Sequence, residues 1–373
     1  MVAPRDSAGR ASFSLHGSKI VVGAPLIGQG AGAVHDAAAG RRIAMITDAN
    51  VAPLHAAPLA STLGVPDGDL LVIAPGEASK TRAEWARLTD AMLDRGFGRD
   101  SAVVAVGGGV VGDLAGFVAA TYMRGVPVIQ VPTTLLAMID AAVGGKTGVD
   151  THAGKNLVGA FHHPAAVVAD PSVLGTLPEW ELRNGLAEAL KHALITSRDE
   201  LGWLVGHAGE VVTPAKATSA AMGELVVRNV RVKAGVVSRD EREGGLRKML
   251  NFGHTIGHAI EAAAAYGMPH GACVAVGMYV EARIAEMTGV ARAGFAPTVA
   301  AALDALGLAR VPAVPVPAAV VAALTHGDKK ARGSRAEYAL LHDVGEPAAA
   351  DSGYSMPVDD SVVARALAEC LAG

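Results

Sequence analysis

Cysteine is scarce in this sequence of 373 residues, and its only two positions are Cys273 and Cys370. Two cysteines exclude a framework of several disulfides, and low cysteine usage fits the reducing cytoplasm, where we expect the protein to be located. The N-terminal residues lack a basic region followed by an apolar run, so we expect no secretory signal. No apolar stretch is long and uninterrupted enough to span a bilayer, which argues against a membrane partner.

Aromatic residues are also scarce, at 4% of the chain, so we expect a core built mainly from Ala, Val and Leu. Hydrophobic residues make up 51% and charged residues 18%, without a block of like charge, which is the balance of a globular protein. The formal net charge of −4, without a basic face that interleaves aromatic residues, argues against a nucleic-acid partner. A chain of this length exceeds one ordinary core and indicates two domains.

The first half of the chain alternates short β-branched runs with helical patterns, which predicts a largely parallel sheet covered on both faces. Helical patterns include Lys80–Arg95 and Val111–Ala120. The predicted strands are Ser18–Val22, Arg42–Thr47, Leu70–Ala74, Ala102–Val106, Val126–Val131 and Ala166–Ala169.

From about Pro178 onward, helical periodicity dominates. The fold class is therefore α/β, with an N-terminal Rossmann-like parallel-sheet domain over residues 1–177 and a mostly α-helical domain over residues 178–373. A short strand pair is predicted near Tyr338–Leu341. The predicted helices are Glu179–Thr196, Thr213–Ser238, Met249–Ala265, Ala272–Met287, Phe295–Leu306 and Val362–Leu371.

A glycine-rich turn follows the strand predicted at Ala102–Val106. Gly107, Gly109 and Gly112 have the G-x-G-x-x-G spacing of a dinucleotide-binding turn, in which backbone N–H groups at a helix start meet phosphate oxygens. The acidic residue expected about twenty positions later is missing, but Asp48 ends an earlier predicted strand and could hold a ribose hydroxyl. The alternative is a turn that only closes a strand–helix joint.

Histidines and a carboxylate in the second half indicate a metal site. His254 and His258 are four residues apart and share a helix face, and His270 follows at a loop-to-helix junction. Glu188 lies among apolar residues and shares a helix face with Lys191, three positions later. One carboxylate and two imidazoles would complete the open three-ligand site of a catalytic divalent metal. The alternatives are core histidines satisfied by neighbours and an ordinary surface ion pair.

Cationic and amide side chains recur inside apolar or glycine-rich segments. In an acidic protein, a local cationic pocket would attract an anionic substrate that carries phosphate or carboxylate. For each residue the alternative is a solvated surface charge. The residues concerned are Arg124, Lys146, Lys155, Asn156, Lys233, Arg247, Lys329 and Lys330.

Several strings in the right order resemble the 3-dehydroquinate synthase family, within the sugar-phosphate cyclase superfamily, and the resemblance extends from about Ile46 to Leu341. Among them are Val131-Pro-Thr-Thr-Leu-Leu136 and Asp328-Lys-Lys330. The other strings are Gly107-Gly-Gly-Val-Val-Gly-Asp-Leu-Ala-Gly116, Val143-Gly-Gly-Lys-Thr-Gly148, Gly154-Lys-Asn-Leu157, Gly185-Leu-Ala-Glu188 and Asn251-Phe-Gly-His-Thr255.

The resemblance implies a role for each matching residue. Glu188, His254 and His270 would be the metal ligands, with zinc or cobalt as the metal. A homodimer is implied, because the family's arginine at the position of Arg124 acts across a dimer interface. NAD would be bound by Asp48, Asn50, Glu77, Lys80, Gly107, Gly108, Gly109, Asp113, Thr133, Thr134, Asp140, Lys146 and Lys155. The substrate would be bound and turned over by Arg124, Lys146, Asn156, Lys191, Lys233, Arg247, Asn251, His258 and one of Lys329 or Lys330.

The implied reaction converts 3-deoxy-arabino-heptulosonate 7-phosphate to 3-dehydroquinate and phosphate, a lyase step of the shikimate pathway to aromatic amino acids. In the family, a divalent metal polarises substrate hydroxyls and NAD accepts a hydride. Phosphate leaves, the hydride returns, and ring opening and an aldol closure complete the carbocycle in one pocket that positions a reactive substrate.

The sequence departs from the family at two places and leaves rival interpretations open. Ala272 stands where the family usually has Glu, and Ala141 and Ala142 stand where Ser is common. One rival is an iron-type alcohol or glycerol dehydrogenase, which would need no phosphate pocket. Another is a sister cyclase that acts on sedoheptulose 7-phosphate or an amino analogue. A third is a relative that only binds nucleotide.

Overall fold

The computed structural model describes residues 10–23, 25, 31–326 and 336–371, and the chain divides into two compact units. Unit 1 comprises Met1–Pro178 and Pro214–Ala234, and unit 2 comprises Glu179–Thr213 and Gly235–Gly373. The boundary predicted after residue 177 lies next to the end of the first segment. It assigned Pro214–Ala234 to the second domain, whereas this segment clusters with unit 1.

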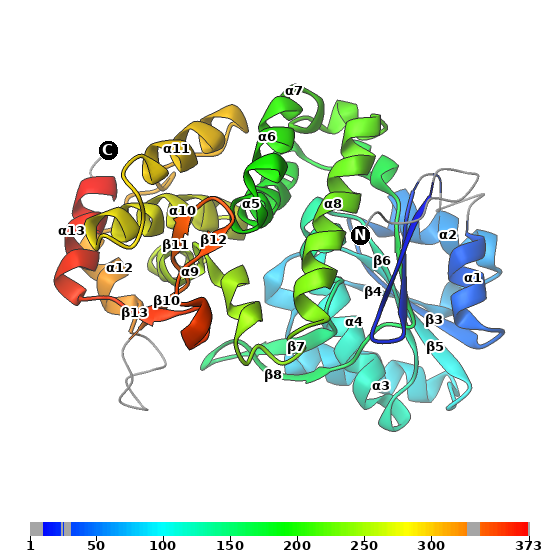
Figure 1. Ribbon diagram of the computed structural model, residues 1–373. Helices are drawn as coiled ribbons and strands as arrows, with labels where there is room; N and C mark the ends of the chain where they lie inside the picture. The colour runs from blue at the N-terminus through cyan, green and yellow to red at the C-terminus, as the bar shows by residue number, and fades with distance from the viewer. Residues whose placement is uncertain (1–9, 24, 26–30, 327–335, 372–373) are drawn as a thin grey trace. The chain divides into compact units, whose positions relative to one another are not determined.

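Among the described residues of unit 1, seven strands form one sheet in the order β1-β2-β9-β6-β5-β3-β4. Figure 1 labels β3, β4, β5 and β6 of this sheet. β1 and β2 pair antiparallel, and the other neighbouring pairs are parallel. β3 lies between β4 and β5, so the strand order reverses between β3 and β5. In open α/β sheets, ligands bind at such a reversal, outside the carboxyl ends of the strands. The strands are β1 (Ala11–Leu15), β2 (Ser18–Val22), β3 (Arg42–Asp48), β4 (Leu70–Ile73), β5 (Ser101–Gly107), β6 (Val128–Pro132) and β9 (Ala166–Ala169).

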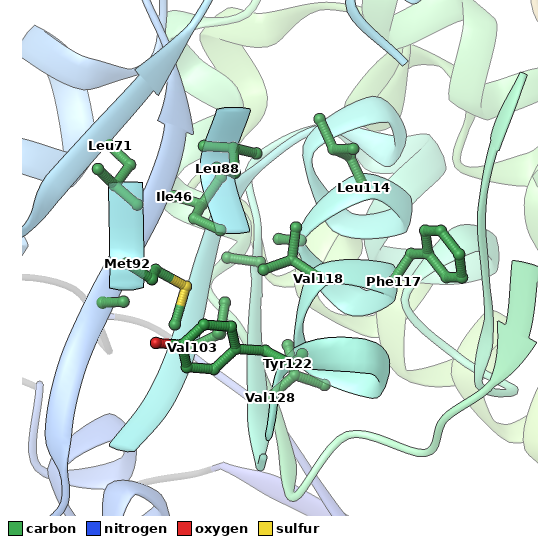
Figure 2. Packing of buried hydrophobic residues seen from close by; sticks show 14 of the residues in the cluster. Ile46, Leu71, Leu88, Met92, Val103, Leu114, Phe117, Val118, Tyr122 and Val128 are labelled. Carbon is green, nitrogen blue, oxygen red and sulfur yellow. The ribbon is translucent and has the colours of Figure 1, made fainter. Parts of the chain in front are cut away.

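Both faces of the sheet are covered, and alternate residues of the fully buried strand β5 contribute to two cores. Val103 packs in one cluster with Met92 and Leu114 (Figure 2). Val104 packs in the other cluster with Leu59. Burial of each such side chain contributes about 1.5–3 kcal/mol. The helices of unit 1 are α1 (Gly32–Ala38), α2 (Ala57–Leu63), α3 (Arg82–Asp94), α4 (Gly109–Thr121) and most of α8 (Ala220–Val237).

A hairpin in unit 1 was missed from the sequence. β7 (Lys146–Thr151) and β8 (Gly154–Phe161) pair antiparallel in a sheet of their own. Gly148 lies opposite Gly159, and a Cβ at Gly159 would lie 2.1 Å from the Thr147 carbonyl oxygen. The glycines that permit this close approach also remove the apolar alternation by which a strand is recognised.

Unit 2 is mostly helical, as predicted. The prediction of one continuous helix over Met249–Ala265 is wrong. The structure has a 3-10 segment, Leu246–Asn251, and a separate helix that begins at His254. The two are divided because Gly253 adopts φ 81° between them. The helices are α5 (Glu179–Thr196), α6 (Arg198–Gly206), α7 (Ala208–Val211), α9 (His254–Ala263), α10 (His270–Met287), α11 (Phe295–Ala305), α12 (Ala318–Leu324) and α13 (Asp360–Leu371).

Four short strands complete unit 2, and two of them, β10 and β11, lie where the short strand pair was predicted near Tyr338–Leu341. β10 (Glu337–Tyr338) pairs with β13 (Met356–Pro357), and β11 (Leu341–Asp343) pairs with β12 (Glu346–Pro347). In the part of the chain that the structure describes, no helix has both the length and the apolar character needed to cross a bilayer.

Candidate metal and cofactor sites

Three imidazole rings meet where α9 and α10 begin. His254 is the first residue of α9 and His258 lies one turn later, while His270 is the first residue of α10. The ring centroid of His254 lies 5.2 Å from that of His258 and 5.4 Å from that of His270. One nitrogen of each ring lies within 4.8 Å of the others. The predicted helical spacing therefore brings His254 and His258 together, and the tertiary fold adds His270.

A buried carboxylate from α5 completes this cluster. Glu188 is 0% exposed, and its Oε1 atom lies 3.4 Å from Nε2 of both His254 and His270. The other carboxylate oxygen pairs with the ammonium group of Lys191, which is also buried. The alternative of a solvated surface pair between Glu188 and Lys191 is therefore wrong.

Burial and neighbouring charges fix the protonation states of the cluster. Burial acts to raise the pKa of Glu188, but Lys191 first, and then His254 and His270, lower this pKa well below its ordinary value. Burial and the Lys191 cation lower the pKa of His254 far below that of a free imidazole, against the effect of Glu188. Burial also acts to lower the pKa of His270, but Glu188 and Glu261 raise it to about 9. A charged Glu188 and a neutral His254 are in the states that bind metals, whereas His270 must release a proton when it binds one.

The donor atoms fit a divalent metal. Two imidazole nitrogens and one carboxylate oxygen, from Glu188, His254 and His270, form the three-ligand set of catalytic zinc sites. Both oxygens of Glu188 are inaccessible to solvent, and a buried carboxylate requires cationic partners to offset its lost hydration. Lys191 supplies one such partner, and a metal bound by Oε1 would supply another.

Glu261 forms the outer part of this cluster. Its Oε2 atom lies 3.4 Å from Nδ1 of His270, on the side of the ring opposite to the atom that faces Glu188. The Glu261 side chain is 6% exposed. A carboxylate that accepts a hydrogen bond from the second ring nitrogen fixes the orientation of a metal-binding histidine and increases its basicity.

In unit 1, the residues predicted for the nucleotide gather at the carboxyl ends of β3, β5 and β6. Oδ1 of Asp48 accepts hydrogen bonds from the backbone N–H groups of Asn50 and Val51, at 2.8 and 3.0 Å, and orders the chain after β3. The N–H group of Thr133 donates to the Gly107 carbonyl at 2.9 Å, joining the ends of β5 and β6. The Thr133 hydroxyl is buried without a hydrogen-bond partner among the described residues.

The glycine turn brings backbone close to its neighbours. A Cβ at Gly107 would lie 2.6 Å from the Val111 side chain, and one at Gly108 would lie 3.2 Å from Thr134 Cγ2. Gly109 begins α4, and no side chain caps the start of this helix. The uncapped N–H groups and the Thr133 hydroxyl together suit a phosphate group, so this part of the chain fits a dinucleotide.

Four more residues predicted for the nucleotide form a charge network. The ammonium group of the buried Lys80 lies 2.6 Å from Asp113 Oδ2 and 3.7 Å from Glu77 Oε1. Lys155 lies 3.9 Å from the same Glu77 oxygen. Burial acts to lower the pKa of Lys80, but Asp113 and Glu77 outweigh this effect and raise it. The Asp150 backbone N–H donates to the Lys80 carbonyl at 2.7 Å, which ties the hairpin to this network.

Other residues of unit 1 predicted for substrate or nucleotide have varied surroundings. Lys233 is buried and pairs with Asp140, so these two predicted residues lie together. Arg124 is exposed and has φ 68°, a backbone conformation that non-glycine residues rarely adopt. Lys146 begins β7 and is exposed. Asn156 in β8 is also exposed and has φ 56°.

In unit 2, a turn before α9 holds Arg247 and Asn251. Asp240 accepts hydrogen bonds from three backbone N–H groups of this turn, including that of Arg247 at 2.9 Å. The Arg247 side chain is 2% exposed and donates to the carbonyl of Glu241. Nδ2 of Asn251 donates to Oε1 of Glu243 at 2.7 Å. The alternative of a solvated surface charge at Arg247 is not supported, because Arg247 is buried.

The described residues include three carboxylates to which sequence reasoning gave no role, namely Glu243, Glu261 and Glu281. Glu261 follows His258 by three positions, and this helical spacing is a signal that could have identified it. Glu281 lies far along α10 and has no such signal. Lys329 and Lys330, predicted as alternatives for substrate binding, lie outside the described residues.

Two solved structures share this fold over nearly the whole chain. A 2-deoxy-scyllo-inosose synthase complexed with carbaglucose-6-phosphate, NAD+ and Co2+ has a TM-score of 0.86 and 27% identity, covering 97% of this chain and 100% of that one. A 2-epi-5-epi-valiolone synthase from Streptomyces hygroscopicus subsp. jinggangensis, with NAD+ and Zn2+ bound, has a TM-score of 0.83 and 29% identity, covering 99% of each chain. The fold class is thus that of the sugar-phosphate cyclases.

Family comparisons define the protein more narrowly. Profiles of the 3-dehydroquinate synthase N-terminal and C-terminal regions match residues 70–184 and 185–331. The 3-dehydroquinate synthase of Acidithiobacillus ferrooxidans is 45% identical over 307 residues, which cover 81% of this chain and 83% of that protein. The chain belongs to the 3-dehydroquinate synthase family, and the predicted resemblance is confirmed.

Proposed function

We propose that the protein converts 3-deoxy-arabino-heptulosonate 7-phosphate to 3-dehydroquinate and phosphate, in the shikimate pathway. The observation that carries this proposal is the buried cluster of Glu188, His254 and His270 in a member of the 3-dehydroquinate synthase family. Family membership favours this cyclase over a dehydrogenase or a binding protein without catalysis. The scarcity of cysteine supports the cytoplasm as its location.

We assign Glu188, His254 and His270 as ligands of zinc or cobalt. When bound, such a metal supplies a Lewis acid for substrate hydroxyl groups. Lys191 keeps Glu188 anionic, and its ammonium group would donate a hydrogen bond to a substrate hydroxyl. The imidazole of His258 is exposed next to the ligand rings and can exchange a proton with the substrate. Bound Co2+ and Zn2+ in the two related synthases support this assignment.

We assign the carboxyl ends of β3, β5 and β6 and the adjoining charge network to NAD. When bound, NAD supplies a reversible hydride acceptor. Thr133 and the start of α4 would hold its phosphates, and Asp48 would hold a ribose hydroxyl. The NAD+ of both related synthases supports this assignment. The residues assigned are Asp48, Asn50, Glu77, Lys80, Gly107, Gly108, Gly109, Asp113, Thr133, Thr134, Asp140, Lys146 and Lys155.

The substrate has two anionic ends, and the chain offers matching donors. In unit 2, Arg247 has a planar fork that can bind both oxygens of a carboxylate, and the Asn251 amide lies in the same turn. In unit 1, we assign Arg124, Lys146, Asn156 and Lys233 to the substrate. The family resemblance supports a homodimer in which Arg124 acts across the interface, and it supports a substrate contact from Lys329 or Lys330.

Phosphate release tests this proposal. The purified protein is supplied with the heptulosonate phosphate, NAD and Zn²⁺ or Co²⁺, and inorganic phosphate is measured over time. We expect phosphate release that a chelator abolishes and either metal restores. Preference for sedoheptulose 7-phosphate would assign the protein to a sister cyclase, and no release from either substrate would refute the proposal.

A further inference from the structure

Beyond the three ligands, the buried carboxylate of Glu281 contacts the backbone on both sides of His254. Its Oε2 atom accepts a hydrogen bond from the Gly253 N–H at 2.7 Å, and its Oε1 atom accepts one from the Ile256 N–H at 3.1 Å. Gly253 directly precedes His254, and Ile256 lies two residues after it. Glu281 therefore caps the start of α9 from a different helix, α10.

Burying the Glu281 carboxyl group costs free energy, and its backbone hydrogen bonds offset this cost. Glu281 is 0% exposed, and burial raises its pKa to about 8 although backbone N–H donors act to lower it. A carboxyl group in such surroundings is tolerated only because those donors satisfy it. The first-turn N–H groups of α9 would otherwise be buried without partners, since no side chain of α9 itself caps this helix.

The same two helices touch backbone to backbone beside Glu281. A Cβ at Gly277 of α10 would lie 2.0 Å from the Gly253 carbonyl oxygen, and one at Gly257 of α9 would lie 3.1 Å from Val274 Cα. These glycines fix the separation of α9 and α10, and Glu281 fixes the start of α9 at this contact. Since His254 and His270 are the first residues of the two helices, the contact also sets the distance between their rings.

We propose that Glu281 is a positioning residue for the metal centre, which holds His254 at the distance from His270 and Glu188 that metal binding requires. This inference rests on the proposed function, because it takes these three residues as ligands. Glu281 acts through the backbone of α9.

A matched control lies one turn and a half further along α10. Glu286 also accepts hydrogen bonds from two backbone N–H groups, those of Gly294 and Ala296 at 2.8 and 3.1 Å. These groups lie at the start of α11, which carries no proposed ligand. Both of these bonds end on Oε1 of Glu286, and its Oε2 atom pairs with Arg283 at 2.8 Å. Glu281→Gln removes one of two capping oxygens, and Glu286→Gln removes the pair with Arg283 from the other capping carboxylate of α10; only the first change lies beside a metal ligand.

The experiment measures Zn²⁺ affinity by competition with a chelator, and the visible absorption spectrum of the Co²⁺-loaded protein. We expect Glu281→Gln to lower Zn²⁺ affinity about 10-fold or more and to change the Co²⁺ spectrum, while Glu286→Gln lowers the melting temperature without either effect. If Glu281→Gln does not fold, Glu281→Asp, which keeps the carboxyl group but shortens the side chain, is expected to show the same changes to a smaller degree.

Unchanged affinity and spectrum in a folded Glu281 variant would overturn the inference, and so would an equal loss of affinity in Glu286→Gln. Failure of the wild-type protein to bind Zn²⁺ or Co²⁺ would instead contradict the proposed ligand set, so the two failures are distinguishable.

Discussion

The Nε2 atom of His254 lies 3.4 Å from the Oε1 atom of Glu188, although the two residues come from different helices. Burial and Lys191 keep the ring of His254 neutral, and Lys191 keeps Glu188 charged. Nδ1 of His254 lies 3.3 Å from the Phe252 carbonyl, and the tautomer that donates to this carbonyl leaves the lone pair of Nε2 facing the Glu188 oxygen. This arrangement is expected of two ligands that share a cation.

Removing one ligand should remove the metal. We expect His254→Ala to lose most of its Zn²⁺ after dialysis and to lose turnover, because two remaining ligands leave the ion weakly held. Metal content is measured by atomic absorption. His35→Ala is the control, since His35 is an exposed histidine of α1. Wild-type metal content and activity in metal-depleted His254→Ala would contradict the ligand assignment.

Lys80 should support both stability and NAD binding in unit 1. In Lys80→Met, the Asp113 carboxylate loses its 2.6 Å partner, and we expect the free energy of unfolding in urea to fall by about 1–3 kcal/mol. NAD should then raise the melting temperature less than it does in the wild type. Arg87→Met removes a pair with Glu84 on the surface of α3 and an exposed hydrogen bond to the Val72 carbonyl, and it should cost about 0–1 kcal/mol. Equal losses in the two variants would argue against a special role for Lys80.

Acid should weaken the turn that holds Arg247. Burial acts to raise the pKa of Asp240, but backbone N–H donors from Arg247, Gly245 and Gly244 lower it below the ordinary value of 3.8. The stability that this group contributes is therefore fully present above about pH 3.8 and is lost as the pH falls through the lower pKa of the folded state. We expect Asp240→Asn to be about 1 kcal/mol less stable than wild type at pH 6, with a difference that shrinks below pH 4. Urea unfolding at both pH values measures this difference, and a constant difference would refute the explanation.

Arg247 should distinguish the candidate substrates. The heptulosonate carries a carboxylate where sedoheptulose 7-phosphate carries a hydroxymethyl group, and loss of a charge-assisted contact should cost about 1.5–3 kcal/mol of transition-state binding. We expect Arg247→Ala to lower kcat/KM for the heptulosonate phosphate about 10- to 100-fold. Arg242→Ala, in an exposed residue of the same turn, should have little effect. Intact turnover in Arg247→Ala would show that another group binds the carboxylate.

The parallel sheet was largely predictable, because its buried strands are short β-branched runs that alternate with helical patterns. Ser18–Val22 and Ala166–Ala169 match β2 and β9 residue for residue. The hairpin around Gly148 was not predictable in this way, because close backbone contact takes the place of side-chain alternation. In the metal cluster, helical spacing predicted that His254 and His258 share a helix face. The role of Glu281 depends on a contact between two helices, which no local sequence pattern indicates.

The stoichiometry of the complete reaction tests whether the protein is a 3-dehydroquinate synthase that uses NAD without consuming it. The metal-loaded protein is mixed with the heptulosonate phosphate and a trace of NAD, and phosphate, 3-dehydroquinate and NADH are followed together. We expect equal amounts of phosphate and 3-dehydroquinate with no net NADH, because the hydride is returned in each turnover. Growth of NADH in step with product, or the absence of phosphate, would contradict it.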